Sequence, residues 1–166
     1  IQAPHVDVFL CETMSSIAEA KAALVAAKKS GLPVWVSLTI EDNDKGVLRS
    51  GELLADAVTM LDEFGADAKL LNCSKPEAIL ASWSKMKSDQ GLTGAYGNGF
   101  TSIDSLQPGG TVKSMESRSD LGPAAYAEFA LQWANQGAAL IGGCCEVGPA
   151  HIKALARRLT EAGYSV

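Results

Sequence analysis

Segments with β-strand character alternate along this chain with segments that have α-helix character. The strand-like segments are 6–12, 34–40, 68–73, 92–96 and 138–141. The helix-like segments, most of which begin near Ser or Pro and end near Gly, are 16–31, 51–64, 74–89, 123–136 and 149–162. Because strict alternation of this kind produces a parallel sheet with helices outside it, the pattern predicts an α/β domain.

Two helix starts carry the spacing of a capping box. Ser16 precedes Glu19 by three residues, and Ser74 precedes Glu77 by the same interval. In this motif the Ser side chain accepts a hydrogen bond from the backbone of the third residue, whose own side chain bonds back to the first. We therefore expect both serines to cap helices.

The number of strand–helix units limits the architecture. Five units in 166 residues are too few for a closed eight-stranded barrel, which takes about 250 residues. They can form an open doubly wound sheet or the later part of a barrel, and the pattern alone does not decide between these two. The Gly- and Pro-containing stretch 97–121 is long for a connection and predicts a functional lid or a mobile segment.

Charge and composition argue against several classes of protein. The net charge is −5 and there is no run of basic residues, so we expect neither nucleic acid nor an anionic membrane as partner. No apolar stretch approaches the roughly 18 residues of a membrane-spanning helix. Four cysteines are too few for a disulfide scaffold, which predicts reduced thiols and a cytoplasmic protein.

Polar residues gather where the predicted strands end. They are Glu12, Thr13, Ser37, Thr39, Asn72, Cys73, Asn98, Cys144 and Cys145. Because active sites of parallel α/β folds lie at the carboxyl ends of the strands, we expect these residues to converge on one rim. His151, in the first turn of the last helix, is expected to have a capping or surface role.

Three of the cysteines have the character of a catalytic zinc site. Cys73, Cys144 and Cys145 lie at two strand ends, and zinc favours thiolate ligands while keeping one position open for substrate. Zinc binds a substrate thiol as the thiolate at neutral pH, and a thiolate is the nucleophile that attack on an electrophilic methyl group needs. Gly142 and Gly143 are expected to let the backbone bend so that consecutive cysteines face one ion.

The two-residue period of strands assigns faces to neighbouring residues. If Glu12 faces the site, then Cys11 faces the helices and is a packing residue rather than a ligand. The same period puts Lys69, Leu71 and Cys73 on one face. Lys69 is therefore expected inside the barrel, where it needs a carboxylate or water as partner.

Four segments resemble the homocysteine S-methyltransferase family: ETMSSIAEAKAAL (12–24), LPVWVSLT (32–39), LLNCSKPEA (70–78) and IGGCCEVGPAHIKAL (141–155). The resemblance implies a (β/α)8 TIM barrel with zinc at its C-terminal rim, and methyl transfer to homocysteine that forms methionine. It implies that Cys73, Cys144 and Cys145 bind the zinc and that Glu12 holds the substrate amino group. Candidates for substrate contacts or for support of the ligands are Thr13, Ser37, Thr39 and Asn72.

The chain also departs from the family. Residues 1–166 resemble the C-terminal part of the barrel, about strands four to eight, and the N-terminal βα units are absent. We expect a fragment of a longer enzyme, a complementing N-terminal segment, or a homo-oligomer that covers the open edges. Glu146 stands where the family usually has Gly, and Tyr96-Gly97-Asn98 replaces a Tyr-Pro-Asn motif. Relatives use S-methylmethionine, S-adenosylmethionine, betaine or methyl-folate as methyl donor, and the sequence does not select among them.

Other functions compete with this one. The chain can be a non-catalytic or degenerate zinc-binding paralogue with an incomplete pocket. Gly142 and Gly143 can instead form the phosphate-binding turn of a barrel aldolase or isomerase, which predicts a phosphate ester and no metal. A redox role of the adjacent Cys144 and Cys145 is compatible with zinc binding, because oxidation would release the ion.

Overall fold

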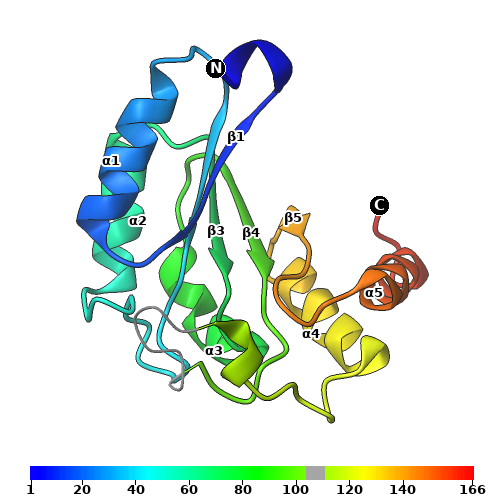
Figure 1. Cartoon of the computed structure of the whole chain (residues 1–166). Helices are drawn as coiled ribbons and strands as arrows, with labels where there is room; N and C mark the ends of the chain where they lie inside the picture. Colours follow the sequence, from blue (N-terminus) through cyan, green and yellow to red (C-terminus); the bar gives the residue numbers. More distant parts are fainter. Residues whose placement is uncertain (104–110) are drawn as a thin grey trace.

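The computed structural model, which describes residues 1–103 and 111–166, is a single parallel sheet with helices on its outer side (Figure 1). The strands are β1 (Phe9–Met14), β2 (Val34–Leu38), β3 (Ala68–Asn72), β4 (Leu92–Tyr96) and β5 (Leu140–Ile141). They pair in chain order and all in parallel. Doubly wound sheets reverse their strand order at a switch point, whereas a barrel adds strands in sequence. The α/β prediction is confirmed, and the strand order is that of a barrel.

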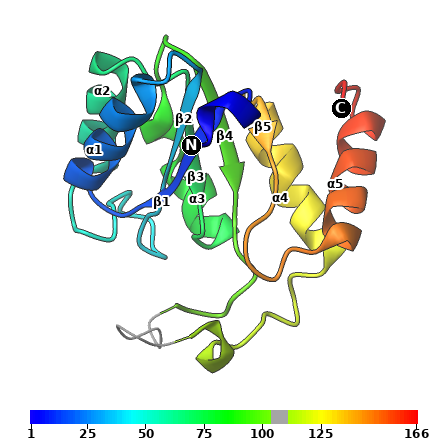
Figure 2. The same cartoon turned by 45° about the horizontal axis from the view of Figure 1, so that its top comes forward.

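The helices follow the strands as predicted. They are α1 (Ile17–Lys28), α2 (Leu54–Glu63), α3 (Pro76–Ser82), α4 (Pro123–Asn135) and α5 (Pro149–Glu161), with short 3-10 turns η1 (Ala3–His5), η2 (Trp83–Met86) and η3 (Val112–Ser114). In Figure 2, α1 and α2 lie at one end of the sheet, and α4 and α5 lie at the other. None of the helices in the described part of the chain is long and apolar enough to cross a bilayer.

The first predicted capping box is half correct and the second is wrong. Ser16 Oγ accepts the Glu19 N–H at 3.2 Å, but the Glu19 carboxylate accepts the N–H of Ser15 rather than that of Ser16. Helix α3 begins at Pro76, and no side chain caps it. The buried Ser74 hydroxyl bonds instead to the backbone N–H and carbonyl of Ile40, at 3.0 and 3.1 Å. The Ser74 hydroxyl therefore forms a tertiary contact just past the end of β2 and does not cap α3.

Several element boundaries differ from the prediction. Strand β1 begins at Phe9 rather than at residue 6, and β5 has only two residues, because it pairs with β4 through just Leu140 and Ile141. The connection between β2 and α2, residues 39–53, includes the fully buried Leu48, which bridges Ile40. In the long stretch 97–121, residues 104–110 lie outside the described part of the chain. Its flanks are joined by a bridge between Phe100 and Ser117, and its role as a lid remains a prediction.

The two faces of the sheet have different environments. Outward side chains of β2 pack into a core with α1 and α2, formed by residues such as Val34, Val36, Leu38, Leu24 and Leu61. Inward side chains line an open hollow of about 230 Å³, whose apolar lining is Leu10, Trp35, Leu70, Tyr96, Leu140 and Ile141. Leu10 is 42% exposed there. Since parallel sheets normally have both faces covered, this inner face has the character of a barrel interior.

Lys69 faces the helices, so the prediction that it lies inside the barrel is wrong. Its fully buried ammonium group bonds to the Asp62 carboxylate of α2, the Ser88 hydroxyl (3.0 Å) and the Gln90 carbonyl. Leu71 shares this face and belongs to the core. Cys73 does not face the helices. Its φ of 51° is not that of a strand, so the alternation of side chains along β3 does not extend to Cys73.

The buried ion pair gives a test of this packing. Asp62→Ala is expected to lower the free energy of unfolding by about 3–5 kcal/mol, because it leaves the Lys69 ammonium buried without a counter-charge. Lys28→Ala removes a more exposed ion pair with Asp67, at 3.0 Å, and is expected to cost less than about 1 kcal/mol. Urea unfolding measures both changes, and equal costs would contradict the placement of Lys69.

Candidate metal centre

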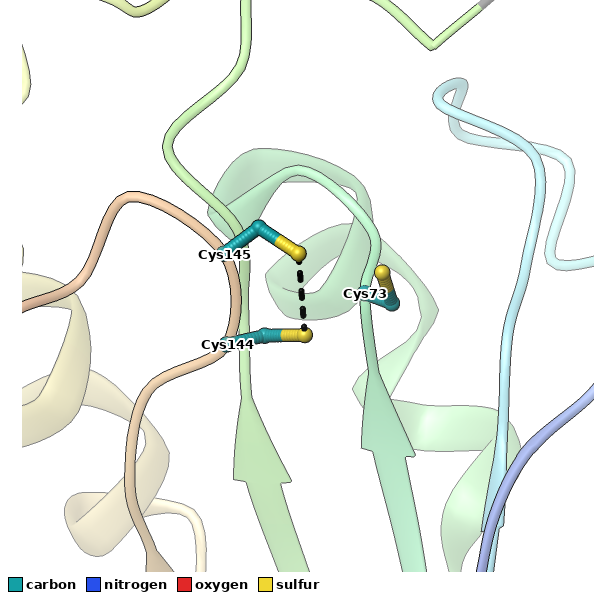
Figure 3. Close-up of side chains that lie close together, drawn as sticks. All are labelled: Cys73, Cys144 and Cys145. Atoms are coloured by element: carbon teal, nitrogen blue, oxygen red, sulfur yellow. Dashed lines mark hydrogen bonds between the residues drawn. The ribbon is translucent and has the colours of Figure 1, made fainter. Parts of the chain in front are cut away.

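Three thiols meet at the carboxyl ends of the strands (Figure 3). The Sγ atoms of Cys73, Cys144 and Cys145 all lie within 4.8 Å of one another, and those of Cys144 and Cys145 are 3.9 Å apart. A disulfide needs about 2.05 Å, so the cysteines are free thiols. Within residues 1–103 and 111–166, these three cysteines form the one cluster of three or more potential His, Cys, Asp or Glu ligands.

The donor set fits zinc. A tetrahedral site with Zn–S bonds of about 2.3 Å places its sulfur atoms about 3.8 Å apart. The Cys144–Cys145 separation of 3.9 Å matches this value. Three soft sulfur donors favour zinc over magnesium or calcium, and a fourth position is left for another ligand.

Backbone hydrogen bonds continue the parallel pairing past the ends of β3, β4 and β5. The Cys73 N–H donates to the Tyr96 carbonyl at 3.3 Å, and the Cys144 N–H donates to the Gly97 carbonyl at 3.0 Å. The Gly99 N–H in turn donates to the Cys145 carbonyl at 2.9 Å. The segment that follows β4 therefore lies between the two ligand-bearing segments and sets their spacing.

Cys73 has a left-handed backbone, which is uncommon for residues other than Gly. This conformation turns its thiol away from the helix-facing side of β3 and toward the other two cysteines. The Cys73 carbonyl accepts a hydrogen bond from Arg49 Nη2 at 3.4 Å and lies 3.5 Å from Thr39 Oγ1. Arg49 Nε also donates to Thr39 Oγ1 at 3.1 Å, so the two side chains support the turn at Cys73 together.

The loop with the other two cysteines bends in a different way from the one predicted. Neither Gly142 nor Gly143 has a positive φ; Gly143 is required because a Cβ there would overlap the Val147 side chain. The left-handed residue is Glu146, with φ 65°. Its exposed carboxylate accepts a hydrogen bond from the Ser117 hydroxyl at 2.6 Å and is not part of the three-sulfur cluster.

The thiols change one another's acidity. A hydrogen bond from Cys73 lowers the pKa of Cys144 to about 6, and the same interaction raises the pKa of Cys73. Burial raises the pKa of Cys145 and that of Cys11. Because metals bind the thiolate form, Cys144 is the thiol of the cluster most available to a metal near neutral pH.

Glu12 lies on the same rim, at the end of β1, with an exposed side chain. Its Oε2 accepts a hydrogen bond of 3.4 Å from the Tyr96 hydroxyl, which comes from β4. Burial raises the pKa of Tyr96, so this hydroxyl remains a neutral donor. The Tyr96 hydroxyl thus orients the Glu12 carboxylate, which remains exposed and able to bind a cationic ligand.

Asn72 connects the segment of Glu12 to the candidate metal ligands. Its Oδ1 accepts from the Thr13 N–H at 3.1 Å and from the Ser37 hydroxyl at 2.8 Å, and its Nδ2 donates to Thr13 Oγ1 at 2.8 Å. Thr13 has φ 63°, an unfavourable value for a β-branched residue, at the point where the β1–β2 register shifts. Asn72 therefore holds the residue after Glu12 and itself immediately precedes Cys73.

The structure divides the predicted site residues into two groups. Glu12 and Thr13 are exposed at the rim, whereas Ser37, Thr39 and Asn72 are buried and bonded to other protein groups. Because Ser37, Thr39 and Asn72 are buried, they are better placed to support the candidate metal ligands than to contact a substrate directly.

Residues outside the predicted ligand set also have defined places. Cys11 packs against the core, as predicted. His151 Nδ1 accepts the Gly148 N–H at 3.2 Å, which confirms its capping role. Asn98 is fully buried, and its Nδ2 has no hydrogen-bond partner among the described residues.

Tyr96 and Arg49 are further parts of the site that were not predicted from the sequence. The two-residue period of β4 could have placed Tyr96 on the inner face beside Gly94. Arg49 had no signal, because it comes from a loop whose path the sequence pattern does not specify.

Comparison with known proteins identifies the family. The sequence pattern of the family described as Homocysteine S-methyltransferase matches residues 1–159. The chain belongs to this family. Homocysteine S-methyltransferase 4 of Zea mays is 28% identical over 95% of this chain and 46% of its own length. Homocysteine S-methyltransferase of Escherichia coli strain K12 is 30% identical over 92% of this chain and 47% of its own length.

The fold of this homocysteine S-methyltransferase family member agrees with that of a solved relative. The oxidized form of the homocysteine methyltransferase MmuM from Escherichia coli superposes with a TM-score of 0.70 at 25% identity. The match covers 93% of this chain and 46% of the MmuM chain. The chain thus spans about half the length of the curated relatives it matches.

Substitution of single cysteines tests the candidate metal centre of this family member. Cys73→Ser, Cys144→Ser and Cys145→Ser are each expected to weaken zinc binding by more than the roughly 10–100-fold that loss of an outer contact costs. Cys11→Ser serves as the control and should bind zinc like the original protein, because Cys11 packs against the core. Competition with a chromogenic chelator measures the affinities. Unchanged affinity in any of the first three variants would remove that residue from the ligand set.

The order of thiol reactivity tests the electrostatics of the cluster. In metal-free protein at pH 7, iodoacetamide is expected to modify Cys144 before Cys11, because the lowered pKa keeps Cys144 largely as thiolate. The rate at Cys144 should fall as the pH decreases through about 6. Peptide mass spectrometry after timed quenching follows each site, and a faster reaction at Cys11 would contradict the assignment.

Proposed function

We propose that this chain forms the zinc- and homocysteine-binding part of an enzyme that transfers a methyl group to the homocysteine thiol and produces methionine. The observation that carries the proposal is the three-sulfur cluster of Cys73, Cys144 and Cys145 on the rim that also holds the Glu12 carboxylate. Family membership supports the same reaction, which the relatives' names state for those proteins.

Zinc would be held by the three cysteine sulfurs and would supply the Lewis acidity that keeps an incoming thiol in its thiolate form at neutral pH. The nucleophilic thiolate would then form a new S–C bond to the methyl group as the bond between that methyl and the donor breaks. The cysteines cannot bind tightly until they lose their protons, and the lowered pKa of Cys144 assists the first of these losses.

Glu12 would bind the ammonium group of homocysteine. Its carboxylate is exposed on the inner side of the rim, and the Tyr96 hydroxyl orients it from β4. Thr13, the next residue, is exposed as well and is a candidate for a polar contact with the substrate. The apolar inner hollow lies beside Gly142 and Gly143, next to the metal loop, and would exclude water from one side of the bound thiol.

Asn72, Ser37 and Thr39 would act as positioning residues. Asn72 joins the Glu12–Thr13 segment to the segment of Cys73 through two hydrogen bonds with Thr13, and the Ser37 hydroxyl donates a third to Asn72 from β2. Thr39 supports the Cys73 carbonyl together with Arg49. The distance between the substrate anchor and the metal ligands would therefore depend on buried groups that do not touch the substrate.

The open inner face would be covered by further strands of a (β/α)8 barrel. Leu10 and Leu92 expose 42% and 46% of their surface, and the outer edges of β1 and β5 have no partner strand among the described residues. N-terminal βα units, in the same polypeptide or in a complementing one, would close the barrel; a second copy of the chain is the alternative cover. The free thiols also support a reducing compartment such as the cytoplasm.

The two alternatives differ in their support. A zinc-binding protein without activity is supported by the open hollow on the inner face, which the described residues line but do not close. A phosphate-binding turn at Gly142 has less support, because the Gly142 and Cys144 N–H groups already donate to Ala95 and Gly97.

Methionine formation by the complete protein tests the proposal. Purified protein is incubated with homocysteine and, in turn, a sulfonium, a quaternary ammonium and a methyl-folate donor. We expect methionine with at least one donor, about one zinc per chain, and loss of both in Cys144→Ser. Zinc without methionine from any donor would favour the inactive zinc-binding alternative, and absence of zinc would contradict the proposal.

A substitution at Glu12 tests the substrate anchor. Glu12→Gln is expected to lower kcat/KM for homocysteine by about 10- to 150-fold, which corresponds to the roughly 1.5–3 kcal/mol of a hydrogen bond to a charged group. Zinc content should not change, because Glu12 is not in the sulfur cluster. Glu41→Gln is the matched control, since within the described part of the chain the Glu41 carboxylate accepts a side-chain hydrogen bond from Asn43 of its own loop alone. Equal activity of the two variants would exclude Glu12 as the anchor.

A further inference from the structure

Tyr126 lies behind the metal centre on α4. Its side chain is fully buried, and its hydroxyl lies 2.8 Å from the Gly142 carbonyl and 3.1 Å from the Gly97 carbonyl. These two carbonyls belong to the residues that directly follow β5 and β4. A phenol carries one proton, so the two carbonyls share a single donor. Burial raises the pKa of Tyr126, which keeps that donor neutral.

The position matters because the chain between β5 and α5 has little support of its own. Strand β5 pairs with β4 through only two residue pairs, and residues 142–148, which include two of the three cysteines, form no helix or strand. The Gly97 carbonyl that contacts Tyr126 also accepts the Cys144 N–H at 3.0 Å. The Tyr126 hydroxyl therefore contacts the backbone where the loop 142–148 begins and where its hydrogen bonds to the segment after β4 continue the pairing of the strands.

The far end of the same loop is held by the same group of side chains. His151 Nδ1 accepts the Gly148 N–H at 3.2 Å, and its Nε2 lies 3.3 Å from the Leu121 carbonyl. The His151 ring packs edge-on against Tyr126 with centroids 5.9 Å apart, and Tyr126 packs edge-on against Trp133 at the same distance. One packed aromatic unit thus contacts both the first and the last residue of the loop 142–148.

We propose that Tyr126 is a positioning residue for metal binding, whose hydroxyl fixes Gly142 beside Gly97 so that Cys144 and Cys145 reach the same ion as Cys73. His151 holds the other end of the loop at Gly148. The inference rests on the proposed zinc site. Its physical basis is preorganisation: a loop that is already ordered loses less conformational entropy when the ion binds. Neither side chain belongs to the sulfur cluster.

Tyr126→Phe tests the hydroxyl, because it keeps the ring that packs on Trp133 and His151. Zinc affinity, measured by chelator competition, is expected to fall by about 10- to 100-fold. Cobalt(II) gives a second readout, since its sulfur-to-metal charge-transfer band reports how many thiolates bind. That band should weaken at equal cobalt occupancy. Tyr164→Phe is the matched control, because it removes a hydroxyl that donates to Asn135 at 2.8 Å, on the C-terminal segment away from the cysteines, and should change neither value.

Two substitutions at His151 test the other end of the loop and remain informative if Tyr126→Phe does not fold. His151→Ala removes the acceptor for the Gly148 N–H and should weaken zinc binding. His151→Gln keeps a side-chain acceptor at the position where Gln serves in a capping box, and should restore most of the affinity. If His151→Ala and His151→Gln both bind zinc with the affinity of the original protein, then His151 does not help to hold the loop for metal binding.

The outcomes separate the inference from the proposed function. If the original protein binds no zinc, the proposed function fails. If it binds zinc and Tyr126→Phe binds zinc and cobalt with unchanged affinity and spectrum, then the positioning role fails while the zinc site stands. Weaker binding in Tyr126→Phe and His151→Ala, with recovery in His151→Gln, supports the inference.

Discussion

The candidate metal centre depends on parallel pairing that continues beyond the strands. Hydrogen bonds from Cys73 to Tyr96, from Cys144 to Gly97 and from Gly99 to Cys145 extend the ladder of β3, β4 and β5. Cys73 follows β3, and Cys144 and Cys145 follow β5, so β4 lies between the two groups. Because neighbouring strands of a sheet lie about 4.8 Å apart, the two backbone segments are about two strand spacings from each other. Their side chains must turn toward each other over β4 to bring three sulfur atoms within 4.8 Å.

Unfavourable backbone conformations produce that turn. Of the described residues other than Gly, those with positive φ are Thr13, Cys73 and Glu146. Thr13 and Cys73 lie at strand ends, and Glu146 lies in the loop that follows β5, so all three are next to or within the predicted site. Such conformations cost about 1–3 kcal/mol each and persist where the surroundings hold them. Here Asn72 holds Thr13, Arg49 and Thr39 support Cys73, and Ser117 bonds to Glu146.

Much of the fold was predictable, because apolar periodicity and helix start signals are local. The same local signals failed where tertiary contacts compete: Ser74 bonds to Ile40 instead of capping α3, and Lys69 pairs with Asp62 on the helix side. The gathering of Cys73, Cys144 and Cys145 was predictable from their places at strand ends, but the left-handed turn at Cys73 was not, since no Gly marks it. Tyr96, Arg49 and Tyr126 act through contacts that join distant segments, which one sequence does not reveal.

X-ray absorption at the zinc edge tests the central claim most directly, because it counts the ligand atoms around the ion. For zinc-loaded protein, we predict three sulfur neighbours at about 2.3 Å and one lighter neighbour. Addition of homocysteine should change the count to four sulfurs, as the substrate thiol takes the open position. Fewer than three sulfurs in the loaded protein, or no gain of sulfur with homocysteine, would contradict a three-cysteine site that binds the substrate thiol.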